Sequence, residues 1–248
     1  MPALLTALAA VYGALAGLLV PRAAHRLAVA PDEPWRDTCP GGHPLTGPAG
    51  GWIGTARCAD CTAPAASWFG PRTPHLAAVT ALLCAALAAA AGLRPELAVW
   101  LALAPFGVLL AVVDLAVHRL PDVLTLPLAA AALALLGVAA ALDGAAGSWT
   151  GALLGGLALG STYLLLFLAR PSGMGFGDVK LAIVLGVTLG WYGWGVLVLG
   201  FFAGVLYGGG YALALVLRGR AGRKTAMPLG PCMLAGTVTG LLLGGFGA

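Results

Sequence analysis

The sequence predicts an all-α, polytopic membrane protein. Hydrophobic residues make up 60% and charged residues 9% of the 248 positions, and the mean hydropathy is +0.95. A soluble globular domain carries about 25% charged residues, so this composition lies outside the soluble range. Apolar segments recur as far as the C-terminus, whereas a secretory signal is a single segment followed by a soluble remainder. We therefore expect the lipid bilayer to surround most of the chain.

The apolar segments predict about eight transmembrane helices. A helix needs about 20 mostly apolar residues to cross the hydrocarbon core of a bilayer. The candidate segments are residues 4–20, 75–92, 97–117, 123–142, 149–168, 179–190, 196–217 and 232–246. The sixth is long enough only if it continues through the aromatic residues at 191–194, which suit the interface between lipid and water.

The distribution of Lys and Arg predicts the direction in which the chain crosses the membrane. Cytoplasmic loops of membrane proteins carry an excess of these residues. With the N-terminus outside, 12 of the 13 basic residues fall on the inner side, and Arg94 is the exception. The twelve are Arg22, Arg26, Arg36, Arg57, Arg72, Arg119, Arg170, Lys180, Arg218, Arg220, Arg223 and Lys224. The net charge of +4 reflects these inner loops, and we expect no nucleic-acid partner.

A polar segment divides the chain into three parts. These are a first transmembrane helix at 1–20, a cytosolic insert at 21–74, and a membrane domain at 75–248. The insert is rich in Pro, Gly and Arg and holds three of the five cysteines. Its few apolar residues cannot build a sizeable core, which makes a bound metal a candidate for stabilising it.

Two aspartates are the candidate catalytic residues. Asp114 lies near the end of the third predicted helix, and Asp178 follows a glycine-rich turn at the start of the sixth. Alternation of the helices places both at the cytosolic membrane face. Carboxylates beside a membrane are costly and usually functional. Two acids in one site share a proton, so that one acts as base and the other as acid, and together they activate water.

Residues close to the two aspartates have candidate roles of their own. Asp122 precedes a predicted helix, and we favour a capping role for it over a catalytic one. Lys180 either helps to hold a substrate or anchors its helix at the inner interface. The glycines of the turn let another backbone approach Asp178. They are Gly173, Gly175 and Gly177.

Other functions are compatible with part of this pattern. A proton-coupled transporter also needs intramembrane carboxylates, but it arranges them along a path, whereas Asp114 and Asp178 are expected at one face. The two aspartates also fit structural roles as helix caps or polar packing groups. An inactive scaffold of a pilus or secretion assembly would need neither acid. The sequence leaves the oligomeric state open.

Three motifs connect the chain to a known family. Asp114 is followed by Leu-Pro-Asp-Val-Leu-Thr-Leu-Pro-Leu at 120–128, then Gly-Met-Gly-Phe-Gly-Asp-Val-Lys-Leu at 173–181 and Pro-Leu-Gly-Pro at 228–231. In this order, and over nearly the whole chain, they resemble the type IV prepilin (leader) peptidases, which are GxGD intramembrane aspartic proteases. The separation of the two aspartates, 178 − 114 = 64, also resembles that of the family's catalytic pair.

The resemblance implies a membrane endopeptidase of the bacterial inner membrane that acts in type IV pilus or type II secretion systems. It would cleave a prepilin or pseudopilin precursor after a glycine, where the basic leader meets the apolar helix. Asp114 and Asp178 would be catalytic, with no cofactor needed for proteolysis. Many members also methylate the new N-terminus with S-adenosylmethionine, which becomes a candidate cofactor here. The chain departs from the family at 17–27 and has no nucleotide-type glycine fingerprint.

The cysteines of the insert match the family only in part. Longer members carry two CxxC pairs that resemble a four-thiolate zinc site, and here Cys58-Ala-Asp-Cys61 is intact. Gly42 stands where the partner of Cys39 is expected, and His43 follows it. Because imidazole is also a zinc ligand, Cys39, His43, Cys58 and Cys61 are a candidate Cys3His zinc site, and loss of the metal is the alternative. Cys84 and Cys232 fit simple packing roles in apolar helices.

Overall fold

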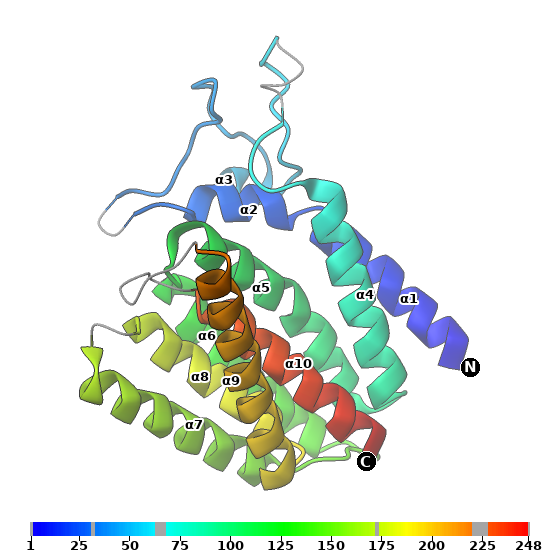
Figure 1. Ribbon diagram of the computed structural model, residues 1–248. Helices are drawn as coiled ribbons and strands as arrows, with labels where there is room; N and C mark the ends of the chain where they lie inside the picture. Colours follow the sequence, from blue (N-terminus) through cyan, green and yellow to red (C-terminus); the bar gives the residue numbers. More distant parts are fainter. Residues whose placement is uncertain (1, 31–32, 63–67, 172–173, 220–227, 248) are drawn as a thin grey trace.

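The structure is a computed structural model that describes all residues except 1, 31–32, 63–67, 172–173, 220–227 and 248. Among the described residues the fold is all-α, as predicted, with eight helices in one bundle and two short helices after the first (Figure 1). The bundle consists of α1 (Pro2–Gly17), α4 (Thr73–Ala91), α5 (Pro95–Val117), α6 (Asp122–Ala140), α7 (Trp149–Ala169), α8 (Phe176–Gly190), α9 (Trp194–Leu217) and α10 (Gly230–Gly247).

Seven helical segments of the described chain are long and apolar enough to cross a membrane. The first runs over Pro2–Leu27 and therefore includes the short helix α2 (Val20–Leu27). The sixth predicted segment corresponds to α8, which has 15 residues and ends at Gly190, so it does not continue through the aromatic residues that follow. Nearly every residue of α8 from Asp178 onward is buried. Because α8 packs between α6, α7 and α10, it meets protein where the other helices meet lipid.

Glycines bring several pairs of helices into close contact. A Cβ atom placed on Gly190 of α8 would lie 2.9 Å from the Cα of Gly155 on α7. A Cβ atom on Gly236 of α10 would lie 2.6 Å from the Cα of Gly204 on α9. Small residues are typical of helix interfaces in membranes, where dispersion contacts and not the hydrophobic effect drive association. The glycine and alanine bias of the sequence thus has a packing function.

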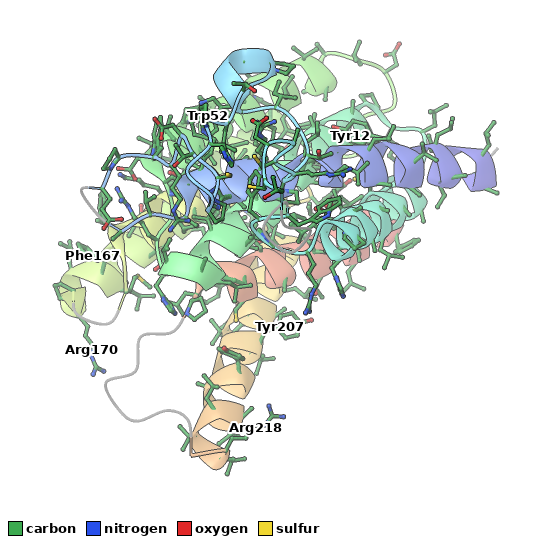
Figure 2. The ribbon with its side chains drawn as sticks, turned by 90° about the horizontal axis from the view of Figure 1, so that it is seen from above. Tyr12, Trp52, Phe167, Arg170, Tyr207 and Arg218 are labelled. Atoms are coloured by element: carbon green, nitrogen blue, oxygen red, sulfur yellow. The ribbon has the colours of Figure 1, made fainter. Side chains whose placement is uncertain are left out.

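The periphery of the bundle is apolar, as expected for lipid contact. Helix α9 extends away from the other helices, with Tyr207 near the start of the projecting part and Arg218 directly after its end (Figure 2). Its buried residues are Leu197, Gly200 and Gly204, all in its first half. The exposed side chains along the second half are mostly apolar. A surface of this kind is stable only in an apolar solvent.

The insert contains α2, the single turn α3 (Pro48–Gly51) and isolated bridges, with no extended strand among its described residues. Two arginines of α2 bind the loops of the insert. Arg22 donates to the carbonyl oxygen of Thr46 at 2.6 Å, and Arg26 donates to the carbonyl oxygen of Gly50 at 3.1 Å. The insert lies at one end of the bundle, and both termini lie toward the other (Figure 1). Its small core consists of Cys39, Leu45, Ala56, Cys58 and Phe69.

Candidate active site and metal centre

Asp114 lies in the last turn of α5 with 4% of its surface exposed. Its Oδ2 atom accepts a hydrogen bond of 2.9 Å from the backbone N–H of Gly230, the first residue of α10. A Cβ atom on Gly230 would lie 2.8 Å from the same oxygen, so any larger residue would displace the carboxylate. Immediately after α5, His118 adopts a left-handed conformation, and its N–H donates to the carbonyl oxygen of Asp114.

Asp178 lies in the first turn of α8 with 7% of its surface exposed. Its Oδ2 atom accepts a hydrogen bond of 3.1 Å from the N–H of Gly175, the N-cap residue of the helix. The helix cap that we considered as an alternative is therefore present, and it occupies one of the two carboxylate oxygens. The positive end of the α8 dipole favours an ionised carboxylate at this position.

The fold brings the two predicted aspartates to the same end of the bundle, where α5 ends and α8 begins; we call this the dyad end. The two carboxylates lie within electrostatic range of each other. Two further groups lie within electrostatic range of them, Tyr163 of α7 in the case of Asp178 and Cys232 of α10 in the case of Asp114. The sequence analysis did not single out Tyr163, and it gave Cys232 a packing role only. Both belong to apolar segments whose composition carries no signal of a site.

The glycine-rich turn is only partly described. Gly173 lies outside the described residues, and Gly175 is the N-cap residue of α8. Gly177 packs against the α5–α6 connection, because a Cβ atom on it would lie 3.0 Å from the Cβ of Leu120. These glycines therefore hold Asp178 close to the connection that follows Asp114.

The predicted capping role of Asp122 is wrong. Pro121 occupies the cap position of α6, and Asp122 lies in the first turn without a capping hydrogen bond. Its Oδ2 atom is instead 2.6 Å from Nζ of Lys180. This ion pair joins the start of α6 to the start of α8. Lys180, which we considered as a substrate-binding residue or an interface anchor, also lies over the ring of Phe176, 4.9 Å from its centroid.

An apolar cavity of about 240 Å³ lies inside the bundle, next to the dyad end. Leucines of α5, α6 and α8 line it, one turn of helix away from the dyad end. The polar side chains among its lining residues are Thr188 and Thr237, whose hydroxyls donate to carbonyl oxygens of their own helices. The cavity therefore offers apolar contacts beside the two carboxyl groups.

The four predicted metal ligands converge in the insert. The ligand atoms of Cys39, His43, Cys58 and Cys61 all lie within 4.8 Å of one another. The Sγ atoms of Cys39 and Cys61 are 3.6 Å apart, and Nδ1 of His43 is 3.4 to 3.7 Å from the three sulfur atoms. Zinc–sulfur bonds of about 2.3 Å and a zinc–nitrogen bond of about 2.0 Å in a tetrahedron require edges of about 3.5 to 3.8 Å. The cluster has the dimensions of a Cys3His metal site.

The backbone explains why His43 and not residue 42 completes the cluster. Gly42 has a φ of +82°, and no atom lies within 4 Å of the position of a Cβ atom on it. A side chain at this position would point away from the sulfur atoms. The neighbouring Gly41 lies against them, because a Cβ atom there would be 2.9 Å from Sγ of Cys61.

The thiols of the cluster differ in acidity. Burial raises the pKa of Cys39. Hydrogen bonds from the backbone at His43 and Gly41 and from the neighbouring thiols lower this pKa by more, so that it falls to about 6. Burial, hydrogen bonding and the negative charge of the neighbouring thiolates raise the pKa of Cys61 to about 12. Cys39 therefore ionises readily whereas Cys61 resists ionisation, and a divalent cation bound between the sulfur atoms would favour the thiolate form of Cys61.

Comparisons with known proteins give matches to one family. The model of the type IV leader peptidase family matches residues 101–213. The prepilin leader peptidase/N-methyltransferase of Aeromonas hydrophila is 34% identical over 220 residues, which cover 84% of this chain and 72% of that protein. The protein of the same name from Burkholderia pseudomallei (strain K96243) is 35% identical over 196 residues, 76% of this chain and 59% of that protein.

A third relative matches a shorter part. The prepilin leader peptidase/N-methyltransferase of Bacillus subtilis (strain 168) is 38% identical over 98 residues, which cover 39% of this chain and 38% of that protein. The chain thus spans less than two thirds of the length of the Burkholderia and Bacillus proteins. No solved structure matches the chain significantly.

Proposed function

The chain belongs to the type IV leader peptidase family, and we propose that Asp114 and Asp178 are its catalytic dyad. The substrate we propose is a prepilin-like precursor, cut after the glycine at which its basic leader meets the apolar helix. One observation carries this proposal. The bundle holds two buried carboxylates at one end, each with one oxygen fixed by a backbone N–H group.

The chemistry follows from the shared proton of two neighbouring acids. The ionised aspartate takes a proton from water as the water oxygen bonds to the peptide carbonyl carbon, and the protonated aspartate gives its proton to the carbonyl oxygen. When the carbon–nitrogen bond breaks, the first aspartate passes its proton to the leaving amine, and a hydroxyl of the intermediate returns a proton to the second. The products are a free carboxyl group and a free amine.

The position of the dyad fits this substrate better than it fits proton transport. A transporter needs polar groups along a path through the membrane. Between the dyad end and the opposite end of the bundle, the described cavity is lined almost entirely by apolar residues. No finding favours the transporter, and the family comparisons favour the peptidase.

For the insert, the proposal is a structural zinc ion bound by Cys39, His43, Cys58 and Cys61. Four protein ligands fill a tetrahedral shell and leave no position for a substrate, which is typical of structural zinc. The core around the cluster is small, so the metal would supply stability that packing does not. Proteolysis itself needs no cofactor.

The proposed orientation has the N-terminus outside and the insert and dyad in the cytosol of a bacterium. This orientation rests on the distribution of basic residues. The names of the relatives also support a second proposed activity, methylation of the new N-terminus with S-adenosylmethionine. It is tested in the same experiment as cleavage.

Co-expression of the chain with a candidate precursor, followed by mass measurement of the mature product, tests the proposal. We expect a product that begins directly after the glycine of the junction, and a methylated product would show up as an added mass on its first residue. A precursor that stays intact with every pilin-like candidate offered would contradict the proposed function.

A further inference from the structure

The side chain of Thr125 on α6 is fully buried, with 0% of its surface exposed. Its hydroxyl has no hydrogen-bond partner among the residues that the structure describes. Burying a hydroxyl without a partner is costly, so each such group in a folded protein calls for an explanation. This residue belongs to the motif at 120–128, and neither the proposed dyad nor the metal site accounts for it.

Six other helical threonines of the chain satisfy their hydroxyls locally. Five of them donate to the carbonyl oxygen four residues earlier, at 2.8 to 3.0 Å. Thr188 donates to the carbonyl oxygen three residues earlier. The hydroxyl of Thr125 makes no such bond, so it remains available to a group outside its own helix. The five are Thr6, Thr80, Thr162, Thr237 and Thr239.

Helical register fixes the level of Thr125 in the bundle. It lies three residues before Leu128, and residues three apart on a helix share a face. Leu128 lines the apolar cavity together with Leu110 of α5 and Leu181 of α8. Because α6 begins at the dyad end, Thr125 lies one turn nearer to that end than the cavity does.

The two aspartates have the same offset from the cavity. Asp114 lies four residues after Leu110, on a helix that ends at the dyad end, and Asp178 lies three residues before Leu181, on a helix that begins there. Three helices, of which α6 contacts both α5 and α8, therefore each place one buried polar side chain a single turn beyond the same cavity. These side chains are Asp114, Thr125 and Asp178.

Each of the two carboxylates has an oxygen that can accept a hydrogen bond from the hydroxyl of Thr125. In each, Oδ2 accepts a backbone hydrogen bond, from Gly230 for Asp114 and from Gly175 for Asp178. No hydrogen bond to either Oδ1 atom is found within the described part of the chain. A carboxylate has about four acceptor sites, so both have spare capacity. Lys180, the cation nearest to Asp178 in the sequence, is already paired with Asp122.

We propose that Thr125 is a positioning residue of the dyad, whose hydroxyl donates a hydrogen bond to the spare oxygen of one aspartate when the precursor closes the site. Hydrogen bonds of catalytic groups are often long or absent in a resting enzyme and form only with substrate bound. The unpaired hydroxyl of the resting structure is then the donor that the closed site requires. The inference rests on the proposed peptidase function.

The experiment compares Thr125→Val, which keeps the shape of the side chain without its hydroxyl, with Thr125→Ser, which keeps the hydroxyl. Cleavage of a precursor by the purified full chain in detergent is measured for both. We expect Thr125→Val to lower kcat by about 10- to 100-fold, the effect of losing a hydrogen bond to a charged group, with KM little changed. Thr125→Ser should restore most of kcat.

Thermal unfolding separates this role from a structural one. Thr125→Val removes an unpaired buried hydroxyl, so its melting temperature should equal or exceed that of the unmodified chain. Thr80→Val is the matched control, because Thr80 is equally buried but donates to the carbonyl oxygen of Leu76 at 2.8 Å. We expect this control to keep kcat. Thr80 lies on α4, which contributes no residue to the proposed dyad.

Three outcomes would overturn the inference. One is an unchanged kcat in Thr125→Val, and another is a lower melting temperature together with a Thr125→Ser variant that is equally slow. If Thr125→Val does not accumulate in the membrane, Thr125→Ser is compared with Thr125→Ala instead. Equal cleavage rates for these two variants are the third outcome that would overturn the inference. Failure of the unmodified chain to cleave any precursor would contradict the proposed function as well.

Discussion

The backbone N–H of Gly230 donates a hydrogen bond to Oδ2 of Asp114 over 2.9 Å, and so joins the start of α10 to the end of α5. The two residues are 116 positions apart in the sequence. The Pro-Leu-Gly-Pro motif at 228–231 thus has a physical role, since it presents a backbone donor where no side chain fits. In the proposed mechanism, this bond fixes the orientation of one catalytic carboxylate.

Substitution of Gly230 by Ala should slow cleavage by about 10- to 100-fold, because displacement of a catalytic group by about 1 Å has an effect of this size. The added Cβ atom would lie 2.8 Å from Oδ2 of Asp114 and force the two apart. Gly209→Ala on α9 is the control, since no atom lies within 4 Å of its Cβ position. The measurement is the rate of precursor cleavage by the two purified variants. Equal rates would show that cleavage does not depend on the contact between Gly230 and Asp114.

Metal analysis of the purified chain should find about one zinc ion per molecule, held by Cys39, His43, Cys58 and Cys61. His43→Ala should lose zinc to a chelator that leaves the unmodified chain loaded, because it removes one of four ligands. His43→Cys, which restores a fourth donor, should retain the metal better than His43→Ala. Absence of zinc from the unmodified chain, or the same chelator resistance in all three proteins, would argue for a degenerate insert.

Cysteines introduced into the loops should report the orientation. A membrane-impermeant maleimide is expected to label Gly144→Cys, between α6 and α7, in intact cells. Arg36→Cys, in the insert, should be labelled only after the inner membrane is opened, because the basic residues of this side favour the cytosol. The unmodified chain gives the background from its own cysteines. The reverse pattern would invert the proposed topology.

Much of the fold can be read from the hydrophobic pattern. The predicted segments at 97–117 and 149–168 correspond to Pro95–Val117 and Trp149–Ala169. Long unbroken apolar runs identify membrane helices in a sequence. The pattern does not show which helix is surrounded by others. From the sequence, α8 is too short to span the membrane. Because it is buried among α6, α7 and α10, its length does not have to match the thickness of the lipid.

The candidate site was predictable where residue chemistry alone limits the options. Asp114 and Asp178 stood out because carboxylates are rare in such a sequence, and His43 because imidazole replaces thiolate as a metal ligand. The partners of these residues were not predictable. The pairing of Asp122 with Lys180 and the unsatisfied hydroxyl of Thr125 depend on contacts between helices, which spacing along the chain does not encode.

The central claim is that Asp114 and Asp178 together perform the cleavage, and the most direct measurement is the cleavage rate of a precursor by purified Asp114→Asn and Asp178→Asn. Each should be slower than the unmodified chain by about a thousandfold or more, while remaining folded. Glu96→Gln is the matched control, because Glu96 is a fully buried acid at the opposite end of α5. We expect it to cleave at the rate of the unmodified chain. Cleavage at that rate by either aspartate variant would contradict the account.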